Sequence, residues 1–446
     1  MREINIYRRA MNVAWPAIVE SCFASIVGII DSMMVGTIGT YAVAAVGLCN
    51  QPKLMAFSFF FALNTAVSAL VARRKGENER EAVHSIVFTA MILSVSVGIL
   101  VGSMCFWQAG RIMTLCGSTE EMYQPAVHYF RIIMCGILFQ VLSLSVSAAL
   151  RGVGSTQIVM KVNILSQSIN LLGNYLLIGG NFGFPALGVA GAAIATVFSS
   201  VVSLLLSLAY MTGKNSYIQL DVLLRSGRRG FRSVIGNIGK LGLPSLAEQI
   251  LMRIGFLFTA VMAAGFGSNA FAANHAGMNL FSLTYAFGEG MQIAAVTLVG
   301  QSLGERDSGK ARQYMKVFLR SGILISLVLA VLYIAGAVPY MMLYFKDDGI
   351  IRLGRQMMYF IAVIVFIQME QQIITGCLKG AGDVFYVTCT TVISVTVIRP
   401  MVTYLLCYTV GLGIMGCWYG ILTDQVCRLL FTAWRYRKGT WTGIHI

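Results

Sequence analysis

The stretch WPAIVE at residues 15–20 returns, after a shift of 228 positions, as LPSLAE at residues 243–248. The same shift carries LRGVG at residues 150–154 onto LKGAG at residues 378–382, far along the chain. Further matched pairs are Gly39 and Gly267, Ala44–Ala45 and Ala272–Ala273, Gly76–Glu77 and Gly304–Glu305, Gly183 and Gly411, and Gly188 and Gly416. A repeat of this length predicts two similar lobes, with the working site between or inside them.

The composition predicts an all-α integral membrane protein. Of 446 residues 57% are hydrophobic and 11% charged, with a mean hydropathy of +0.75, whereas soluble domains carry about 25% charged residues. Apolar stretches of roughly 20 residues or more, enough to cross a bilayer as helix, lie at 13–36, 43–72, 83–107, 124–150, 158–180, 187–212, 241–265, 270–300, 313–338, 351–376, 386–410 and 413–434. Six spans per repeat is an even number, so the two repeats enter the membrane the same way up and are parallel.

The Lys and Arg residues predict the orientation. Most of the 33 lie in one set of loops and helix ends that includes both termini, and the opposite loops hold few, such as Arg111 and Lys346. Both termini are therefore expected on the cytoplasmic side of the cell (inner or plasma) membrane. The net charge of +15 then reflects topology, and because it is spread over many segments, no nucleic-acid partner is expected.

The repeat and the spans predict three parts: an N-terminal six-helix lobe at 1–212, a basic cytoplasmic connector at 213–240 and a C-terminal six-helix lobe at 241–446. The connector is glycine-bearing and suited to the anionic leaflet of a membrane. A plain linker explains it as well as a regulatory segment does.

Motifs for enzyme chemistry are poor. The four histidines have no metal-ligand spacing, the ten cysteines include no C-x-x-C pair, and no phosphate-binding loop occurs. GLGIMG at 411–416 fits G-x-G-x-x-G but follows no predicted strand. The sequence therefore predicts neither an enzyme nor a cofactor or metal centre.

Ionisable residues inside the predicted spans are the strongest functional signal, because charge in a bilayer is costly and is kept for a reason. They are Glu20, Asp31, Glu248, Arg253, Glu289, Glu370, Arg399 and Asp424.

Asp31 is expected to form a cation or proton site. At 1.5 Å per residue it lies about 7 Å below the outer end of its span, and Asn170 and Asn174 lie roughly 15 and 9 Å below the outer end of theirs. The two asparagines are four residues apart and share a helix face, and Thr196 falls at a similar depth. The alternative is a buried aspartate that asparagines bond for packing alone.

The second repeat lacks this polar set. The shift of 228 places Thr259, Ile398 and Val402 at the positions of Asp31, Asn170 and Asn174. Packing alone gives little reason for such a difference in polarity. We therefore expect the coupling chemistry in the N-terminal lobe only.

Other polar residues are candidates for the substrate cavity or for gating. Glu20 and Glu248 are repeat-matched near the cytoplasmic end, which favours a structural or gating role over substrate contact. Gln140 and Gln368 are also matched and are expected to line the space between the lobes.

The remaining charges are harder to place. Glu370 is expected to pair with a cation such as Arg399 or Arg253. Asp424 and Arg428 are four apart on one helix and are expected to neutralise each other. Glu289 stands between Gly288 and Gly290 and has no predicted partner.

Taken together, several stretches resemble the multidrug and toxic compound extrusion (MATE) transporters over essentially the full chain. They are Pro16 through DSMMVG (31–36), LRGVGSTQ (150–157), SINLLGNYLLI (168–178), GFPALGVAGAAIAT (183–196), AAVTLVGQSLGERD (294–307) and GIMGCWYGILTDQVCR (413–428). The resemblance implies a V-shaped two-lobe arrangement and cation-coupled antiport. A proton or Na⁺ moves inward through the first lobe, while organic, often cationic and aromatic, compounds leave between the lobes by alternating access.

The resemblance assigns Asp31 as the acid of helix 1, Asn170 as the asparagine of helix 5 and Thr196 as the threonine of helix 6. Asn174 departs from it, since one branch of the family has a second aspartate there. Met252 and Gln368 stand where another branch has acids. The N-terminal site is therefore expected to be the sole coupling centre, with Na⁺ at Asp31 as the one possible metal ion.

The expected partners are small organic compounds and membrane lipids, and the expected state is a monomer without a cofactor beyond H⁺ or Na⁺. Abundant Phe, Met and Tyr suit an adaptable apolar cavity, although such residues also face lipid or fill a core. Two alternatives remain. A lipid-linked precursor flippase would need an extended cationic cavity, and a membrane-embedded enzyme would need a catalytic pair at one depth.

Overall fold

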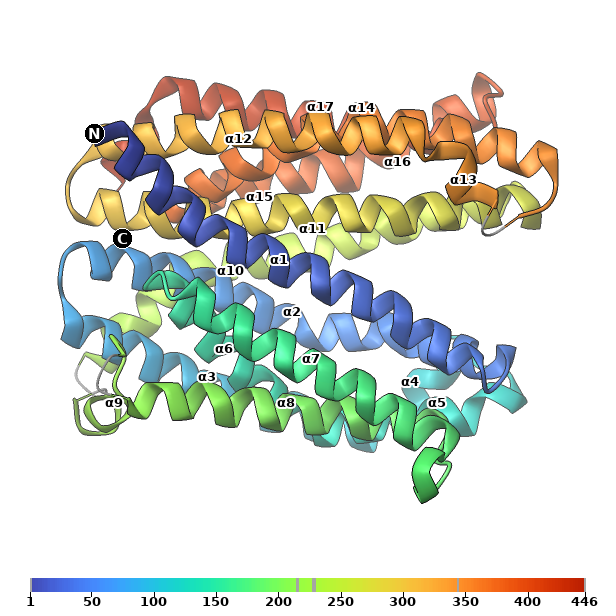
Figure 1. Cartoon of the computed structure of the whole chain (residues 1–446), viewed down its shortest axis with the longest axis horizontal. Helices are drawn as coiled ribbons and strands as arrows, with labels where there is room; N and C mark the ends of the chain where they lie inside the picture. The colour runs from blue at the N-terminus through green and yellow to red at the C-terminus, as the bar shows by residue number, and fades with distance from the viewer. Residues whose placement is uncertain (1, 214–215, 227–229, 343–344, 445–446) are drawn as a thin grey trace. The chain divides into compact units, whose positions relative to one another are not determined.

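The computed structural model describes residues 2–213, 216–226, 230–342 and 345–444, and within these ranges the chain is helical with short loops and no β-strand (Figure 1). Residues 214–215 and 227–229 of the predicted connector lie outside the described ranges. The all-helical architecture follows from the long apolar stretches, because helices satisfy their own backbone hydrogen bonds within a membrane.

All twelve predicted spans are helical. In the first repeat they are α1 (Arg2–Gly36), α2 (Thr40–Gly76), α3 (Arg80–Trp107), α5 (Glu120–Cys135) with α6 (Ile137–Gly152), α7 (Thr156–Gly179) and α8 (Val189–Thr212). In the second they are α10 (Phe231–Ala264), α11 (Ser268–Gly304), α12 (Ser308–Ala335), α14 (Asp348–Ala381), the run from α15 (Val384–Val392) through η2 (Ile393–Ile398) and α16 (Arg399–Tyr404) to η3 (Leu405–Thr409), and α17 (Met415–Lys438). Short helices α4 (Ala109–Leu115), α9 (Leu220–Ser226) and α13 (Ala337–Met342) lie in the connections.

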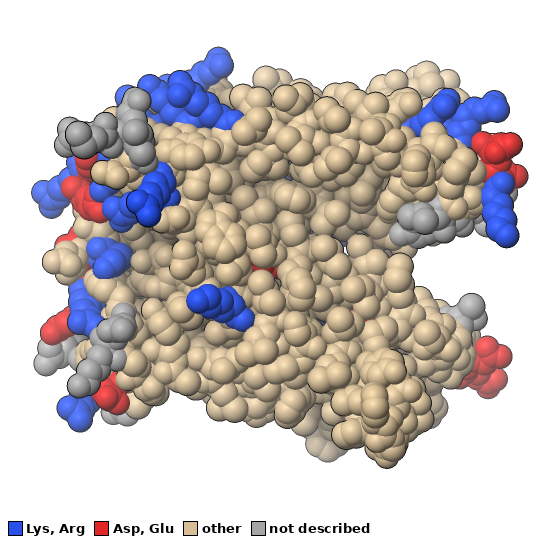
Figure 2. Space-filling model, in the orientation of Figure 1, with Lys and Arg blue, Asp and Glu red and all other residues tan. Residues whose placement is uncertain are grey.

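The membrane character rests on helix length and composition. Eight helices of the described ranges are individually long and apolar enough to cross a bilayer, and nine if α5 and α6, which bend by 51° at their break, count as one. On the face that Figure 2 displays, charged side chains lie mostly toward the helix ends and uncharged side chains cover the helix middles.

The duplication is visible in the backbone. Both ends of α11 lie 228 positions after the ends of α2, and both ends of α12 lie 228 positions after those of α3. The turns between these helices place Asn78 (φ 61°) and Arg306 (φ 59°) in the same left-handed conformation. This conformation is uncommon for residues other than glycine, so its recurrence marks one structural unit used twice.

Contacts divide the chain into two compact units, residues 1–22 with 243–446 and residues 23–242. The core of the 23–242 unit is built around Phe60, Phe130 and Ile133, and that of the other unit around Trp418 and Tyr314. The first 22 residues thus pack with the C-terminal helices. The lobe boundaries inferred from the repeat stay a prediction.

The described parts of the connector include helical turns and contacts with α3. Helix α10 begins at Phe231, ten residues before the predicted span, after Gly230 in a left-handed conformation (φ 71°). Ahead of α9, Arg80 of α3 donates to the carbonyls of Tyr217 (3.0 Å) and Ser216 (3.3 Å). These bonds fix this part of the connector to α3.

Repeat-matched glycines let helices cross closely. A Cβ added to Gly152 of α6 would lie 2.9 Å from the carbonyl oxygen of Ser68 in α2, and one added to Gly380 of α14 would lie 2.6 Å from that of Val296 in α11. Contacts this short with backbone are not tolerated, so both crossings require glycine.

We predict that Gly152→Ala and Gly380→Ala each lower the free energy of unfolding by about 1–3 kcal/mol, the usual cost of overpacking. The check is the midpoint of thermal unfolding in detergent. Gly236→Ala in α10 is the control, since its Cβ would meet nothing within 4 Å and alanine favours a helix. Equal midpoints for all three variants would contradict the packing argument.

Candidate functional site

The 23–242 unit brings together Asp31 and the three residues predicted to surround it. Asn174 Nδ2 donates to Asp31 Oδ1 at 2.7 Å. The Asn170 amide has one orientation that satisfies both of its ends: Nδ2 then donates to Asp31 Oδ2 at 3.1 Å, and the oxygen accepts from Thr196 Oγ1 (3.2 Å) and Thr196 N (3.1 Å). Helices α1, α7 and α8 therefore meet at one carboxylate.

Local sequence explains this geometry. Asn170 and Asn174 are one helical turn apart on α7 and are 3% and 2% exposed. Gly173 lies between them, and a Cβ there would come within 2.9 Å of the Ala195 side chain. The glycine lets α7 and α8 approach closely enough for Thr196 to reach the Asn170 amide.

Lys53 is a member of this site that sequence reasoning missed. It is half-buried on α2, and its ammonium acts electrostatically on the Asp31 carboxylate. Tyr129 on α5 and Cys49 on α2 also lie within electrostatic reach of this pair. The criterion of an ionisable residue inside a predicted span would also have selected Lys53, because Lys53 lies inside the predicted span 43–72.

The arrangement suits an exchangeable monovalent cation. A carboxylate in an apolar lobe needs a counter-charge or hydrogen-bond donors, and Asp31 has two amide donors and a nearby ammonium. Among the described residues Asn174 Oδ1 has no hydrogen-bond partner, so rotation of this amide would offer an oxygen to a protonated Asp31 or to a Na⁺ ion. Over the described residues, no group of three or more His, Cys, Asp or Glu is placed to hold a metal ion.

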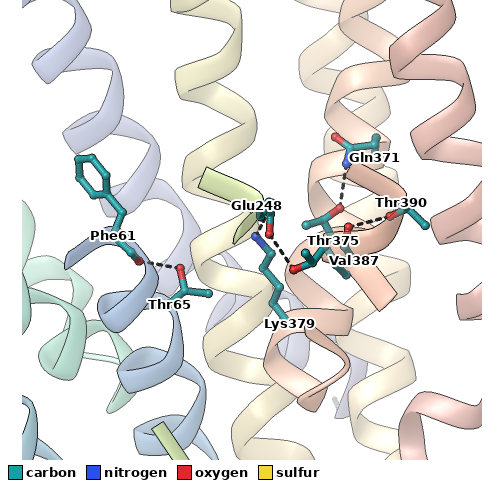
Figure 3. A network of polar contacts seen from close by, with 9 residues as sticks. Phe61, Thr65, Glu248, Gln371, Thr375, Lys379, Val387 and Thr390 are labelled. Atoms are coloured by element: carbon teal, nitrogen blue, oxygen red, sulfur yellow. Dashed lines mark hydrogen bonds and ion pairs between the residues drawn. The ribbon is translucent and has the colours of Figure 1, made fainter. Parts of the chain in front are cut away.

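Glu248 forms a buried ion pair in the C-terminal unit. Lys379 Nζ of α14 lies 3.1 Å from Glu248 Oε1, and Thr388 Oγ1 donates to Oε2 at 3.4 Å (Figure 3). The shift of 228 that matches Glu248 with Glu20 also matches Lys379 with Arg151. The charges at both ends of this pair are therefore duplicated in the sequence.

The other cavity or gating candidates are dispersed. Glu20 is 6% exposed at the middle of α1. Gln140 is half-buried on α6 in the 23–242 unit, and Gln368 is 1% exposed on α14 in the C-terminal unit. Over the described ranges the amide nitrogens of both glutamines have no hydrogen-bond partner, and the predicted roles of Glu20, Gln140 and Gln368 stay predictions.

The two glycines beside Glu289 have separate packing roles. A Cβ on Gly288 would lie 1.6 Å from Gln372 Oε1 of α14, and one on Gly290 would lie 2.5 Å from the backbone of Ile18 in α1. Close packing on two sides of α11 leaves Glu289 pointing in a third direction, where its side chain is exposed. Tyr285, one turn earlier, is 41% exposed.

Asp424 is the centre of a third charged cluster. Arg428 Nη2 donates to its Oδ2 at 2.9 Å, as the spacing of four predicts, and Arg399 Nη1 lies 4.0 Å from the same oxygen. Arg399 is thus directed at Asp424 and not at Glu370. Glu370 Oε1 instead has no hydrogen-bond partner among the residues that the structure describes and lies against Gly322 of α12.

A π-helical segment changes how the two repeats correspond around Arg399. Helix α15 begins 228 positions after α7, but η2 then inserts a π-helical stretch, which carries an extra residue. The contact of Asn170 on α7 with Thr196 on α8 then has its counterpart in the approach of Arg399 to Asp424 on α17, which lies 228 positions after Thr196. Arg399 therefore takes the place of Asn170, where the uncorrected shift had placed Ile398.

Known proteins provide an independent comparison. The MatE family model matches residues 16–176 and again residues 244–405, more than half of the chain. The second match is one residue longer than the first.

Whole-length relatives agree with this match. The chain is 25% identical over 440 residues to the probable multidrug resistance protein NorM of Thermotoga maritima, covering 98% of this chain and 93% of the relative. It is 24% identical over 417 residues to the multidrug resistance protein NorM of Vibrio cholerae, covering 92% and 91%.

A solved structure of an outward-facing multidrug resistance MATE family transporter of the MOP superfamily has the same fold. The TM-score is 0.90 at 21% identity, covering 98% of this chain and 97% of the other. The twelve-helix, two-repeat fold and the double family match establish that the chain belongs to the MatE family of multidrug and toxic compound extrusion transporters.

Proposed function

We propose that this protein is a secondary active multidrug exporter that moves organic compounds out of the cell in exchange for a proton or Na⁺ bound at Asp31. The observation that carries the proposal is the Asp31 carboxylate held by Asn174 and Asn170 inside an apolar unit. The second repeat has Thr259 at the matching position, so this site occurs once.

Cation binding would change the contacts between α1 and α7. The ionised Asp31 accepts hydrogen bonds from two amide N–H groups, whereas a protonated oxygen is itself a donor and no longer suits an N–H group. The Asn174 amide must then rotate or the helices must shift. Such a change is the kind of two-state event that can bias the protein between its outward-open and inward-open states.

The substrates we propose are organic compounds that are cationic and aromatic. Exposed Tyr285 and Glu289, one turn apart on α11, offer a ring face and a carboxylate to such a compound. The names of the relatives, which are multidrug resistance proteins, support small organic compounds as substrates.

The distribution of Lys and Arg supports a plasma-membrane protein with both termini in the cytoplasm. We propose that it works as a monomer in contact with lipids and without nucleic acid or an enzymatic cofactor. Coupling then depends on an ion gradient.

We predict that Asp31→Asn abolishes gradient-driven export, because the amide cannot exchange a proton or balance the charge of Na⁺. The measurement is efflux of ethidium from proteoliposomes under an imposed pH gradient and, separately, an imposed Na⁺ gradient. Thr259→Val is the control, since it alters the repeat-matched position while nearly keeping side-chain volume, and it should transport normally. Undiminished gradient-dependent export by Asp31→Asn would refute the proposal.

We further propose that Glu248 and Lys379 form a fixed clamp between α10 and α14 and make no contact with substrate. Removing one partner of a buried pair leaves an uncompensated charge and costs about 3–5 kcal/mol. We therefore predict a large fall in thermal stability for Glu248→Gln, with most of it restored by adding Lys379→Met. A stable Glu248→Gln protein that binds ethidium more weakly would instead make Glu248 a substrate contact.

A further inference from the structure

The Arg399 guanidinium is buried with few partners. Arg399 is 5% exposed, and its Nε has no hydrogen-bond partner among the described residues. Its Nη1 comes no closer than 4.0 Å to Asp424, and its flat face lies 5.0 Å from the ring of Phe256. A buried charge with so little compensation is costly, so its retention inside a membrane span calls for a function.

Arg399 is also a surplus positive charge. Arg428 already neutralises Asp424 through the 2.9 Å bond, and both residues are buried. Within the described part of the chain, Asp424 Oδ1 has no hydrogen-bond partner and remains available to a second cation. The cluster of Asp424, Arg428 and Arg399 therefore carries a net charge of about +1 if all three groups are ionised.

The cluster lies at the positions that match two neighbours of Asp31, Asn170 and Thr196, and it resembles the loaded Asp31 site in charge. After the one-residue π-helical insertion, Arg399 occupies the position of Asn170, which contacts Asp31. In the first repeat Asp31 and Lys53 balance each other, and an incoming monovalent cation brings that site to the same charge of about +1. The second cluster has this charge permanently.

We propose that the C-terminal repeat contains a monovalent-cation site that is permanently filled by its own side chain, with the Arg399 guanidinium in the role of the exchangeable cation. The carboxylate of this site is Asp424, and its fixed counter-charge is Arg428, as Lys53 is for Asp31. The inference rests on the proposed coupling at Asp31. It implies that the second repeat stays in the loaded state and that only the first repeat exchanges ions.

The test is to empty the second site in protein whose first site is disabled. In an Asp31→Asn background, thermal unfolding in detergent is measured with Na⁺ or with the large cation N-methyl-D-glucamine at constant ionic strength, and over a range of pH. In this background we expect the unfolding midpoint to be the same with Na⁺ as with N-methyl-D-glucamine. After Arg399→Gln is added, Na⁺ or protons should raise the unfolding midpoint by about 2–4 °C or more. The reason is that a ligand that binds only the native state raises the midpoint.

Three controls make the result specific. Adding Asp424→Asn to the Arg399→Gln protein should remove the new response, because the carboxylate that binds the cation is gone. Arg399→Lys should show none, because an ammonium still fills the site. Arg355→Gln, which removes an exposed arginine near the start of α14, should also show none.

The proposal is overturned if Arg399→Gln gives a folded protein without a response, or if the response persists after Asp424→Asn. Should Arg399→Gln fail to fold, Arg399→Ala is purified with and without millimolar methylguanidinium. Recovery of folded protein by this cation supports the proposal, and failure to recover with it contradicts it. Because the readout is stability, it separates this inference from a failure of Asp31-coupled transport.

Discussion

The structure depends most on how a carboxylate is kept inside an apolar helical unit. Asp31 is stabilised there by two amide N–H groups and a nearby ammonium. These partners come from α2 and α7, so the position of α1 depends on the state of one side chain. A site with this construction responds to a single cation, because neutralising the carboxylate removes the reason for the amide groups to face it.

Cation binding at Asp31 takes place within a helical framework that the chain contains twice. Both repeats use the same helix lengths in α2 and α11 and in α3 and α12, the same left-handed turns at Asn78 and Arg306, and glycines such as Gly152 and Gly380 where helices cross. Features kept in both copies serve packing. Two features are present in one copy only: Asp31 in the first repeat and the Arg399 cluster in the second. Helix packing does not explain why either is there.

The sequence was sufficient for much of the fold and of the Asp31 site. Apolar length predicted twelve spans, and helical rise placed Asp31, Asn170, Asn174 and Thr196 at similar depths, which the structure brings into contact. The correspondence between repeats went wrong at Arg399, because a π-helical insertion adds one residue without any sign in hydropathy. Long-range partners, such as Lys379 for Glu248, depend on how helices pack, which periodicity does not report.

The central claim is that binding of an organic compound and binding of a cation are coupled through Asp31. The most direct measurement is the release of protons, or of Na⁺ in a parallel titration, when ethidium is added to the purified protein in weakly buffered solution. The account predicts release of about one ion per protein molecule at saturation, and none from Asp31→Asn protein that still binds ethidium. Release of the same size from that variant, or none from the unmodified protein on binding, would contradict it.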